Sequence, residues 1–330
     1  MESIWAFEIE ITKFLQSLGT WLQFPMELFT FLGNEEFYML IMPALYWCVD
    51  PILGVRIGVM LVTSGTLNST AKLLFKSPRP YWVDTQVQAF ITESSFGLPS
   101  GHAMNSMSVW GLLAASLRKK AKRVIPVLVI LLVGISRIYL GVHFTSDVLV
   151  GWLMGFLLLL VYLRSEKQIT RWVKNISFSR FVVFMFLVAL TAILINAGII
   201  SANRDWQIPS SWLATIAVTA PHSEIDPLSL DGTITNAAVF FGLVSGAMWF
   251  HRKGGFNAGG NWVLRLLRYV LGLAGVLVLW AGLGNVFPDS ANLIGYSLRF
   301  VRYTLTGLWI SAGAPLVFQK LGLLEKVKDQ

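Results

Sequence analysis

The chain has 330 residues, of which 55% are apolar and only 13% are charged. A soluble domain carries about twice that share of charged residues, so the composition excludes an ordinary soluble protein and favours membrane spans of roughly 20 residues each. The net charge of +8 does not indicate nucleic-acid binding, because the basic residues stand in short clusters between apolar runs, as in cytoplasmic loops. The single cysteine, Cys48, excludes an intramolecular disulfide and offers no zinc site.

Residues 1–33 are predicted to form an interfacial amphipathic segment and not a span. Apolar side chains recur at helical spacing with charged ones between them: Ile4, Phe7, Ile11, Phe14 and Leu18, interrupted by Glu8, Glu10 and Lys13. We expect the apolar face either to lie in the membrane interface or to pack on the outer surface of the protein itself.

Nine apolar runs follow and are predicted to be transmembrane helices, which gives an all-α integral membrane protein. They cover residues 36–49, 52–75, 100–117, 124–141, 146–163, 179–200, 232–250, 266–286 and 297–318. Basic residues concentrate after the third, fifth and seventh runs and in the C-terminal tail, whereas acidic residues dominate the N-terminal segment and the loop after the sixth run. This alternation predicts an N-terminus outside and a C-terminus in the cytoplasm.

Ionisable residues near membrane depth are costly, and they mark candidate functional sites. In this sequence they concentrate in three segments, residues 72–80, 99–102 and 136–147. Under the predicted orientation all three segments lie at the outer membrane face. The sequence therefore places several cations and two of the four histidines at the same depth, at the outer membrane face.

The cations and the helix start in these segments suit a phosphoryl group. Arg79 and Arg137 can each bind two phosphate oxygens, and Lys72 adds a point charge. Lys72 and Arg79 are seven residues apart, or two helical turns, so both face one pocket if the helix persists that far. Ser100 and Gly101 are predicted to begin a helix, where free N–H groups favour an anion.

The two histidines suit phosphoryl transfer. His143 and Asp147 stand at i and i+4, so the carboxylate can hold one imidazole nitrogen and leave the other free to attack. His102 is then available to protonate the leaving oxygen. Taken singly, Lys72 or Arg137 is more often an interfacial residue, and His143 is as often a packed histidine. Only the joint pattern supports the catalytic interpretation.

That joint pattern resembles the phosphatidic-acid phosphatase type 2 superfamily over roughly residues 35–160. Its three motifs read here as Lys72…Arg79-Pro80, Pro99-Ser100-Gly101-His102 and Ser136-Arg137…His143…Asp147. The resemblance implies a nucleophile at His143, an acid at His102 and a phosphohistidine intermediate. It implies phosphate ligands at the remaining motif positions, Lys72, Arg79, Ser100, Gly101 and Arg137. It also implies catalysis without a metal or cofactor, and a six-helix catalytic core over residues 34–200, which leaves residues 201–330 as accessory transmembrane helices.

Two branches of this superfamily are similar to the chain. Residues 36–50 resemble the start of sphingosine-1-phosphate phosphatases, whereas residues 79–82 and 100–104 resemble glucose-6-phosphatases. Short loops and the single cysteine indicate a bacterial plasma-membrane protein. We expect it to hydrolyse a lipid phosphate monoester or pyrophosphate at the outer face, with phosphorylated lipid and membrane lipids as its partners. The alternatives are a phosphatase of a soluble sugar phosphate, a lipid phosphotransferase, and a transporter or scramblase whose charges line a path.

Overall fold

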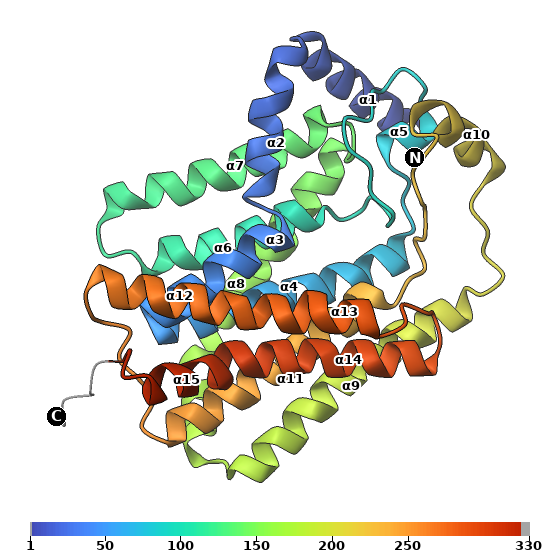
Figure 1. The fold of residues 1–330 in the computed structure, drawn as a ribbon. Helices are drawn as coiled ribbons and strands as arrows, with labels where there is room; N and C mark the ends of the chain where they lie inside the picture. The colour runs from blue at the N-terminus through green and yellow to red at the C-terminus, as the bar shows by residue number, and fades with distance from the viewer. Residues whose placement is uncertain (1, 325–330) are drawn as a thin grey trace. The chain divides into compact units, whose positions relative to one another are not determined.

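The computed structural model of the chain describes residues 2–324, and every regular element in that range is a helix (Figure 1). The α-helices are α1 (Glu2–Ser17), α2 (Gln23–Phe31), α3 (Glu35–Cys48), α4 (Pro51–Phe75), α5 (Pro80–Val83), α6 (Gly101–Ser116), α7 (Val124–Tyr139), α8 (Thr145–Asn175), α9 (Phe178–Ala202), α10 (Ser210–Thr219), α11 (Asp231–Arg252), α12 (Trp262–Leu277), α13 (Leu283–Val286), α14 (Leu293–Leu308) and α15 (Ala314–Lys320). The π-helical turns η3 (Val278–Gly282) and η4 (Trp309–Gly313) join α12 to α13 and α14 to α15. The all-α prediction is confirmed.

Each of the nine predicted apolar runs coincides with a helix. Five helical stretches in the described part of the chain are long and apolar enough to cross a membrane, namely Pro51–Val83, Thr145–Asn175, Phe178–Ala202, Asp231–Arg252 and Trp262–Val286. Helix α8 continues past the predicted end at residue 163, because residues 164–175 contain neither glycine nor proline. The number of nine spans and the orientation stay predictions.

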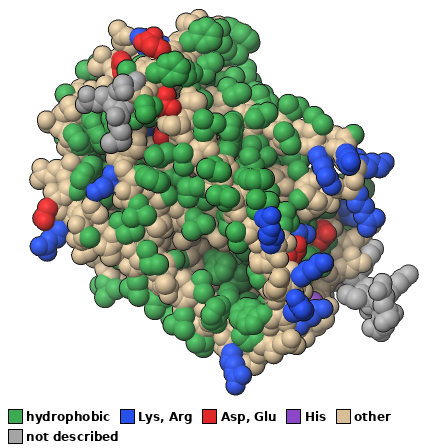
Figure 2. Space-filling model, turned by 180° about the vertical axis from the view of Figure 1, so that it is seen from behind, with side chains coloured by type: hydrophobic (Ala, Val, Ile, Leu, Met, Phe, Trp, Pro, Cys, Tyr) green, Lys and Arg blue, Asp and Glu red, His purple; other side chains and the backbone are tan. Residues whose placement is uncertain are grey.

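Large apolar side chains lie on the surface in unusual number. The face drawn in Figure 2 is dominated by hydrophobic side chains, and exposed Leu, Val and Phe residues recur along α8 and α9. Water-soluble monomers rarely expose apolar patches larger than a few hundred Å². Such a surface is what contact with lipid chains requires.

The helices form two compact units. The first comprises Met1–Phe37, Leu67–Arg164 and Ile195–Ser229, and the second comprises Tyr38–Thr66, Ser165–Leu194 and Leu230–Gln330. All of the predicted site residues fall in the first unit. The predicted division of the chain into residues 1–33, 34–200 and 201–330 stays a prediction.

Within the first unit, two close helix contacts position the predicted motifs. Helices α6 and α7 lie side by side (Figure 1). Gly151 and Gly155 bring α8 against α6, because a Cβ atom at either position would stand 2.6 Å from the carbonyl oxygens of Ser100 and Met104, respectively. This close approach joins the start of α6 to the start of α8, where the second and third motifs lie.

The N-terminal segment is two helices and not one. Gly19, with φ of +110°, ends α1 and turns the chain toward α2. One face of α1 packs on the first unit through Glu8 and Ile9, both buried, whereas Phe7 and Phe14 on the opposite face are exposed. Helix α1 therefore packs on the protein itself and still offers an apolar outer face, and its location in a membrane interface stays a prediction.

In the second unit, α11 and α14 run side by side (Figure 1). Gly242 and Gly307 permit the close approach, since a Cβ atom at Gly242 would stand 2.2 Å from the carbonyl oxygen of Thr304. Arg299 of α14 pairs with Asp231 at 3.0 Å. The glycine contact and the ion pair stabilise the packing of α14 against α11, and the accessory role of residues 201–330 stays a prediction.

Candidate active site

The first motif reaches the site by a route that the sequence did not predict. The condition for a helical route, a helix that persists from Lys72 to Arg79, is not met: α4 ends at Phe75, Lys76 adopts a φ of +49°, and Arg79 is extended. The prolines on either side of Arg79 account for the break, because they remove backbone donors and disfavour the helical conformation before them. Lys72 and Arg79 still meet, since both donate to Ser95 Oγ, at 2.8 Å from Lys72 Nζ and 3.2 Å from Arg79 Nη2.

The guanidinium of Arg79 is buried and held by carbonyl oxygens. Its Nε donates to the Ser95 carbonyl at 2.7 Å, and its Nη2 donates to the Phe96 carbonyl at 3.1 Å. Its Nη1 donates to the Val142 carbonyl at 2.9 Å and lies 3.3 Å from His143 Nε2. A fixed cation therefore stands beside one ring nitrogen of the predicted nucleophile.

His143 and Asp147 make the predicted contact, although His143 lies just before α8 and not within it. His143 Nδ1 is 3.2 Å from Asp147 Oδ2, which also accepts from the Phe144 N–H at 3.0 Å. Burial lowers the pKa of His143 well below its ordinary value, and the neighbouring Arg79 lowers it further. With Nδ1 donating to the carboxylate, the neutral ring carries its lone pair on Nε2.

The second motif begins a helix, as predicted. Ser100 is the N-cap of α6, and its Oγ accepts from the Ala103 N–H at 3.4 Å. The Ser100 N–H donates to the backbone carbonyl of Asp147 at 2.9 Å, which ties this motif to the third. His102 lies in the first turn of α6, and its Nε2 is 2.6 Å from Asn34 Oδ1. The charge of Arg137 also acts electrostatically on His102.

Arg137 completes the cation cluster, which we define as Lys72, Arg79 and Arg137. It lies buried in the last turn of α7, where Nη1 donates to Thr30 Oγ1 at 2.6 Å and Nη2 pairs with Glu93. Its Nε has no hydrogen-bond partner within residues 2–324. The cluster therefore combines three cations and retains an unused donor.

Glu93 was missed by the sequence interpretation, and it bridges the two arginines. Besides the pair with Arg137, its carboxylate lies 4.0 Å from Arg79 Nη2. Burial alone would raise the pKa of Glu93, but Arg137 and Arg79 outweigh it and hold that pKa well below its ordinary range. The carboxylate is therefore ionised at neutral pH.

Helix α1 also reaches the site, and this too was missed. Glu8 accepts from the Ser146 N–H at 2.7 Å and from Ser146 Oγ at 3.0 Å, so it caps the N-terminus of α8 next to Asp147. The ring of Trp5 stacks on Phe144, with ring centroids 5.9 Å apart. These contacts hold the segment that carries the predicted nucleophile.

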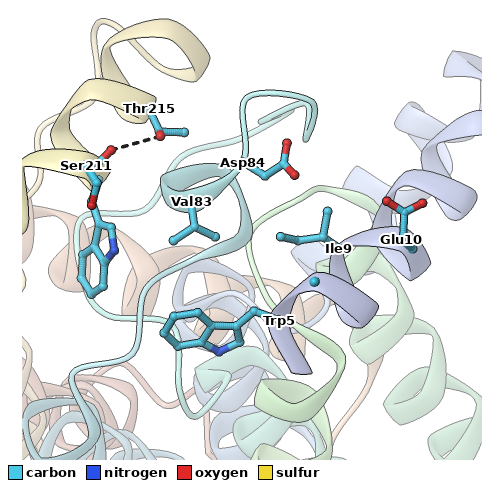
Figure 3. Close-up of a pocket in the computed structure, with 9 residues that line it drawn as sticks. Trp5, Ile9, Glu10, Val83, Asp84, Ser211 and Thr215 are labelled. Atoms are coloured by element: carbon cyan, nitrogen blue, oxygen red, sulfur yellow. Dashed lines mark hydrogen bonds between the residues drawn. The ribbon is translucent and has the colours of Figure 1, made fainter. Parts of the chain in front are cut away.

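A separate cavity of about 360 Å³ opens between α1, the end of α5 and α10. Figure 3 shows Trp5, Ile9 and Glu10 on one side of it and Ser211 and Thr215 on the other. None of its lining residues belongs to the three motifs. One of its lining residues, Trp5, stacks on Phe144 next to His143.

The site suits an anion better than a metal cation. Within the described part of the chain, no group of three or more His, Cys, Asp or Glu side chains is arranged to hold a metal ion. The donors that converge are instead guanidinium, ammonium and helix N–H groups, which bind tetrahedral oxyanions. A neutral imidazole nitrogen next to such an anion can attack it.

Comparison with known sequences finds two matched regions. The first region, residues 53–171, matches the PAP2 superfamily. The second, PAP2 superfamily phosphatase, transmembrane extension, matches residues 234–326. The first region contains all three motifs, and the second covers helices to which the sequence assigned only a supporting role.

Three relatives illustrate the likeness. Phosphatidylglycerophosphatase B of Bacillus subtilis is 37% identical over 125 residues, which is 34% of this chain and 59% of that protein. Sphingosine-1-phosphate phosphatase 1 of Rattus norvegicus is 30% identical over 139 residues, 40% of this chain and 32% of that protein. Glucose-6-phosphatase 3 of Homo sapiens is 24% identical over 344 residues, 96% of this chain and 95% of that protein. The chain therefore spans less than two thirds of the first two relatives and nearly all of the third.

Proposed function

Because this chain belongs to the PAP2 superfamily and is an integral membrane protein, we propose that it hydrolyses a phosphorylated lipid through a phosphohistidine on His143. One observation carries the proposal: Nε2 of the buried His143 imidazole lies 3.3 Å from Nη1 of Arg79, a guanidinium that can hold a phosphate oxygen. Lipid phosphate is the substrate class named for two of the relatives, the Bacillus and the rat enzymes.

Substrate binding uses the cation cluster and the start of α6. Arg79 and Arg137 bind the non-bridging oxygens, Lys72 adds charge, and the Ser100 hydroxyl and the Gly101 N–H at the start of α6 donate to a further oxygen. Three carbonyl groups fix the guanidinium of Arg79, so an arriving phosphate oxygen needs to replace only its contacts to Ser95 Oγ and His143 Nε2.

In the first chemical step, His143 Nε2 attacks phosphorus, an N–P bond forms and the P–O bond to the leaving group breaks. Asp147 accepts the Nδ1 hydrogen bond and stabilises the positive charge that develops on the ring. His102 gives its proton to the leaving oxygen. Because Nε2 of His102 lies against Asn34 Oδ1, the leaving oxygen must take the place of that amide oxygen before Nε2 can donate a proton to it.

In the second step, water replaces the histidine. His102, now neutral, takes a proton from the water, whose oxygen attacks phosphorus as the N–P bond breaks. Inorganic phosphate leaves and His143 returns to its neutral form. The site residues account for both steps without a metal, and a phosphotransferase would differ only in using a second alcohol in place of water.

The side of the membrane and the cellular location are part of the proposal. The charge alternation of the loops supports an active site at the outer face, and we place the protein in a bacterial plasma membrane. A lipid head group then enters the site from the outer leaflet.

A second candidate is hydrolysis of a soluble sugar phosphate. It is favoured by the likeness to glucose-6-phosphatase 3, which spans 96% of this chain. Phosphate release from purified protein, measured with phosphatidylglycerophosphate, sphingosine 1-phosphate, undecaprenyl pyrophosphate and glucose 6-phosphate, separates the two. We expect the highest kcat/KM on a lipid, and a higher value on glucose 6-phosphate would transfer the protein to the second class.

A further inference from the structure

Glu93 places a carboxylate among the cations that the proposed function assigns to phosphate. It pairs with Arg137 Nη2 and lies 4.0 Å from Arg79 Nη2. A carboxylate and a phosphate offer guanidinium groups the same pair of oxygen acceptors, so they compete for the same donors. The arginine side chains are at most 1% exposed, whereas the side chain of Glu93 is 28% exposed.

The burial of Arg137 explains why a carboxylate stands there. A buried cation without a counter-ion is strongly destabilising. The other contact of the Arg137 guanidinium, to Thr30 Oγ1, is with a neutral group. Glu93 therefore supplies the neutralising charge when no anion is bound. Once a phosphate is bound, the same carboxylate becomes a like charge next to it and opposes binding.

The backbone around Glu93 is anchored independently of its carboxylate. The Glu93 N–H donates to Tyr81 Oη at 3.1 Å, and the Tyr81 hydroxyl donates to the Glu93 carbonyl at 3.1 Å. Tyr81 is fully buried, so it fixes this part of the loop. The partly exposed carboxylate can consequently leave Arg137 by side-chain rotation without moving Ser95, which contacts Lys72 and Arg79.

We propose that Glu93 is an internal counter-ion that sets the anion affinity of the site. It neutralises Arg137 while the site is empty and leaves Arg137 when a phosphoryl group binds. The inference rests on the proposed function, because it takes the cation cluster to be the phosphate site. Its consequence is that the charge of Glu93 weakens the binding of inorganic phosphate and so promotes product release.

The alternative role for Glu93 is to hold Arg137 in position for phosphate, and this role predicts the opposite result. The test is isothermal titration calorimetry of orthovanadate and inorganic phosphate with wild type, Glu93→Gln and Glu10→Gln. Glu10 is exposed on α1 and provides the matched control. We expect Glu93→Gln to lower the Kd for both anions on the order of tenfold, because one competing charge-assisted contact is lost, and Glu10→Gln to leave Kd unchanged.

Kinetics give a second readout. Glu93→Gln is expected to lower KM and to increase product inhibition by phosphate, with no rise in kcat. Weaker or unchanged anion binding by Glu93→Gln would overturn the inference. If the glutamine variant does not fold, as judged by gel filtration and thermal melting, Glu93→Asp replaces it; its shorter side chain keeps the charge but withdraws it from Arg137, so tighter anion binding is again expected.

The titration separates this inference from the proposed function. If wild type binds phosphate more tightly than Glu93→Gln does, the counter-ion role alone is overturned. Wild type that binds neither anion would overturn the assignment of the cation cluster, and the counter-ion role with it.

Discussion

Replacing Glu8 with glutamine tests whether α1 holds the segment that carries His143. Glu8 is buried, and its two carboxylate oxygens accept from the N–H and Oγ of Ser146 at 2.7 and 3.0 Å. That N–H is one of the four at the start of α8 that have no partner within the helix. Glutamine keeps one acceptor oxygen but loses the charge that interacts with the helix dipole.

The magnitude follows from these contacts. A hydrogen bond to a charged group contributes about 1.5–3 kcal/mol and a neutral one about 0.5–1.5 kcal/mol, and the dipole interaction adds about 0.3–1 kcal/mol. Glu8→Gln should therefore cost about 1–2 kcal/mol of local stability. Hydrogen–deuterium exchange over residues 140–150 should then accelerate roughly 5- to 30-fold. We expect kcat to fall as well, because Asp147 and His143 lose their fixed positions.

The control is Glu10→Gln on the exposed face of the same helix, where Glu10 pairs with Lys13 at 2.8 Å. A surface pair of this kind contributes little, so exchange over residues 140–150 should match wild type. Equal exchange in wild type and Glu8→Gln would refute the role of α1. A change confined to residues 2–17 would do the same.

The remaining predictions concern catalysis, pH, metal and topology. His102→Ala should cost about 10²–10⁴-fold in kcat/KM on a lipid phosphate but much less on p-nitrophenyl phosphate, whose leaving group needs no proton, and equal losses would remove the acid role. Because the pKa of His143 is lowered, the neutral nucleophile persists below pH 6.5. After correction for ionisation of the substrate, kcat/KM should therefore begin to fall with decreasing pH only below pH 6.5. A fall that begins at or above pH 6.5 would contradict the burial argument. EDTA should leave turnover intact and vanadate should inhibit it, whereas loss of activity restored by Mg²⁺ would require a metal. A C-terminal reporter should lie in the cytoplasm and a tag in residues 202–209 should be accessible from outside, and the reverse result would move the site to the cytoplasmic face.

Local sequence spacing was enough to predict the parts of the site that depend on one helix end. Ser100 caps α6, and Asp147 contacts His143 four residues before it, because short-range backbone geometry dictates both. The break before Arg79 was also foreseeable, since the prolines beside it oppose a continuous helix. Lys72 and Arg79 do converge, as predicted, but they do so through a shared contact with Ser95 Oγ and not along one continuous helix.

The residues that were missed depend on tertiary contacts. Glu93 and Ser95 lie in an irregular segment whose path is set by Tyr81 and Arg79, and no periodicity marks them. The signal that could have pointed to Glu93 is the burial of Arg137, because a buried arginine needs a neighbouring carboxylate as its counter-ion. Glu8 lies on an amphipathic helix with apolar residues on both its packed and exposed faces, so the pattern alone did not show which face was buried.

Trapping of the phosphoenzyme tests the central claim most directly. Purified wild type is mixed with a ³²P-labelled lipid phosphate, quenched in base within one turnover, digested and analysed by mass spectrometry. We predict a base-stable, acid-labile phosphoryl group on the peptide that contains His143, and no label in His143→Ala. A label on another residue, or turnover that persists in His143→Ala, would contradict the mechanism.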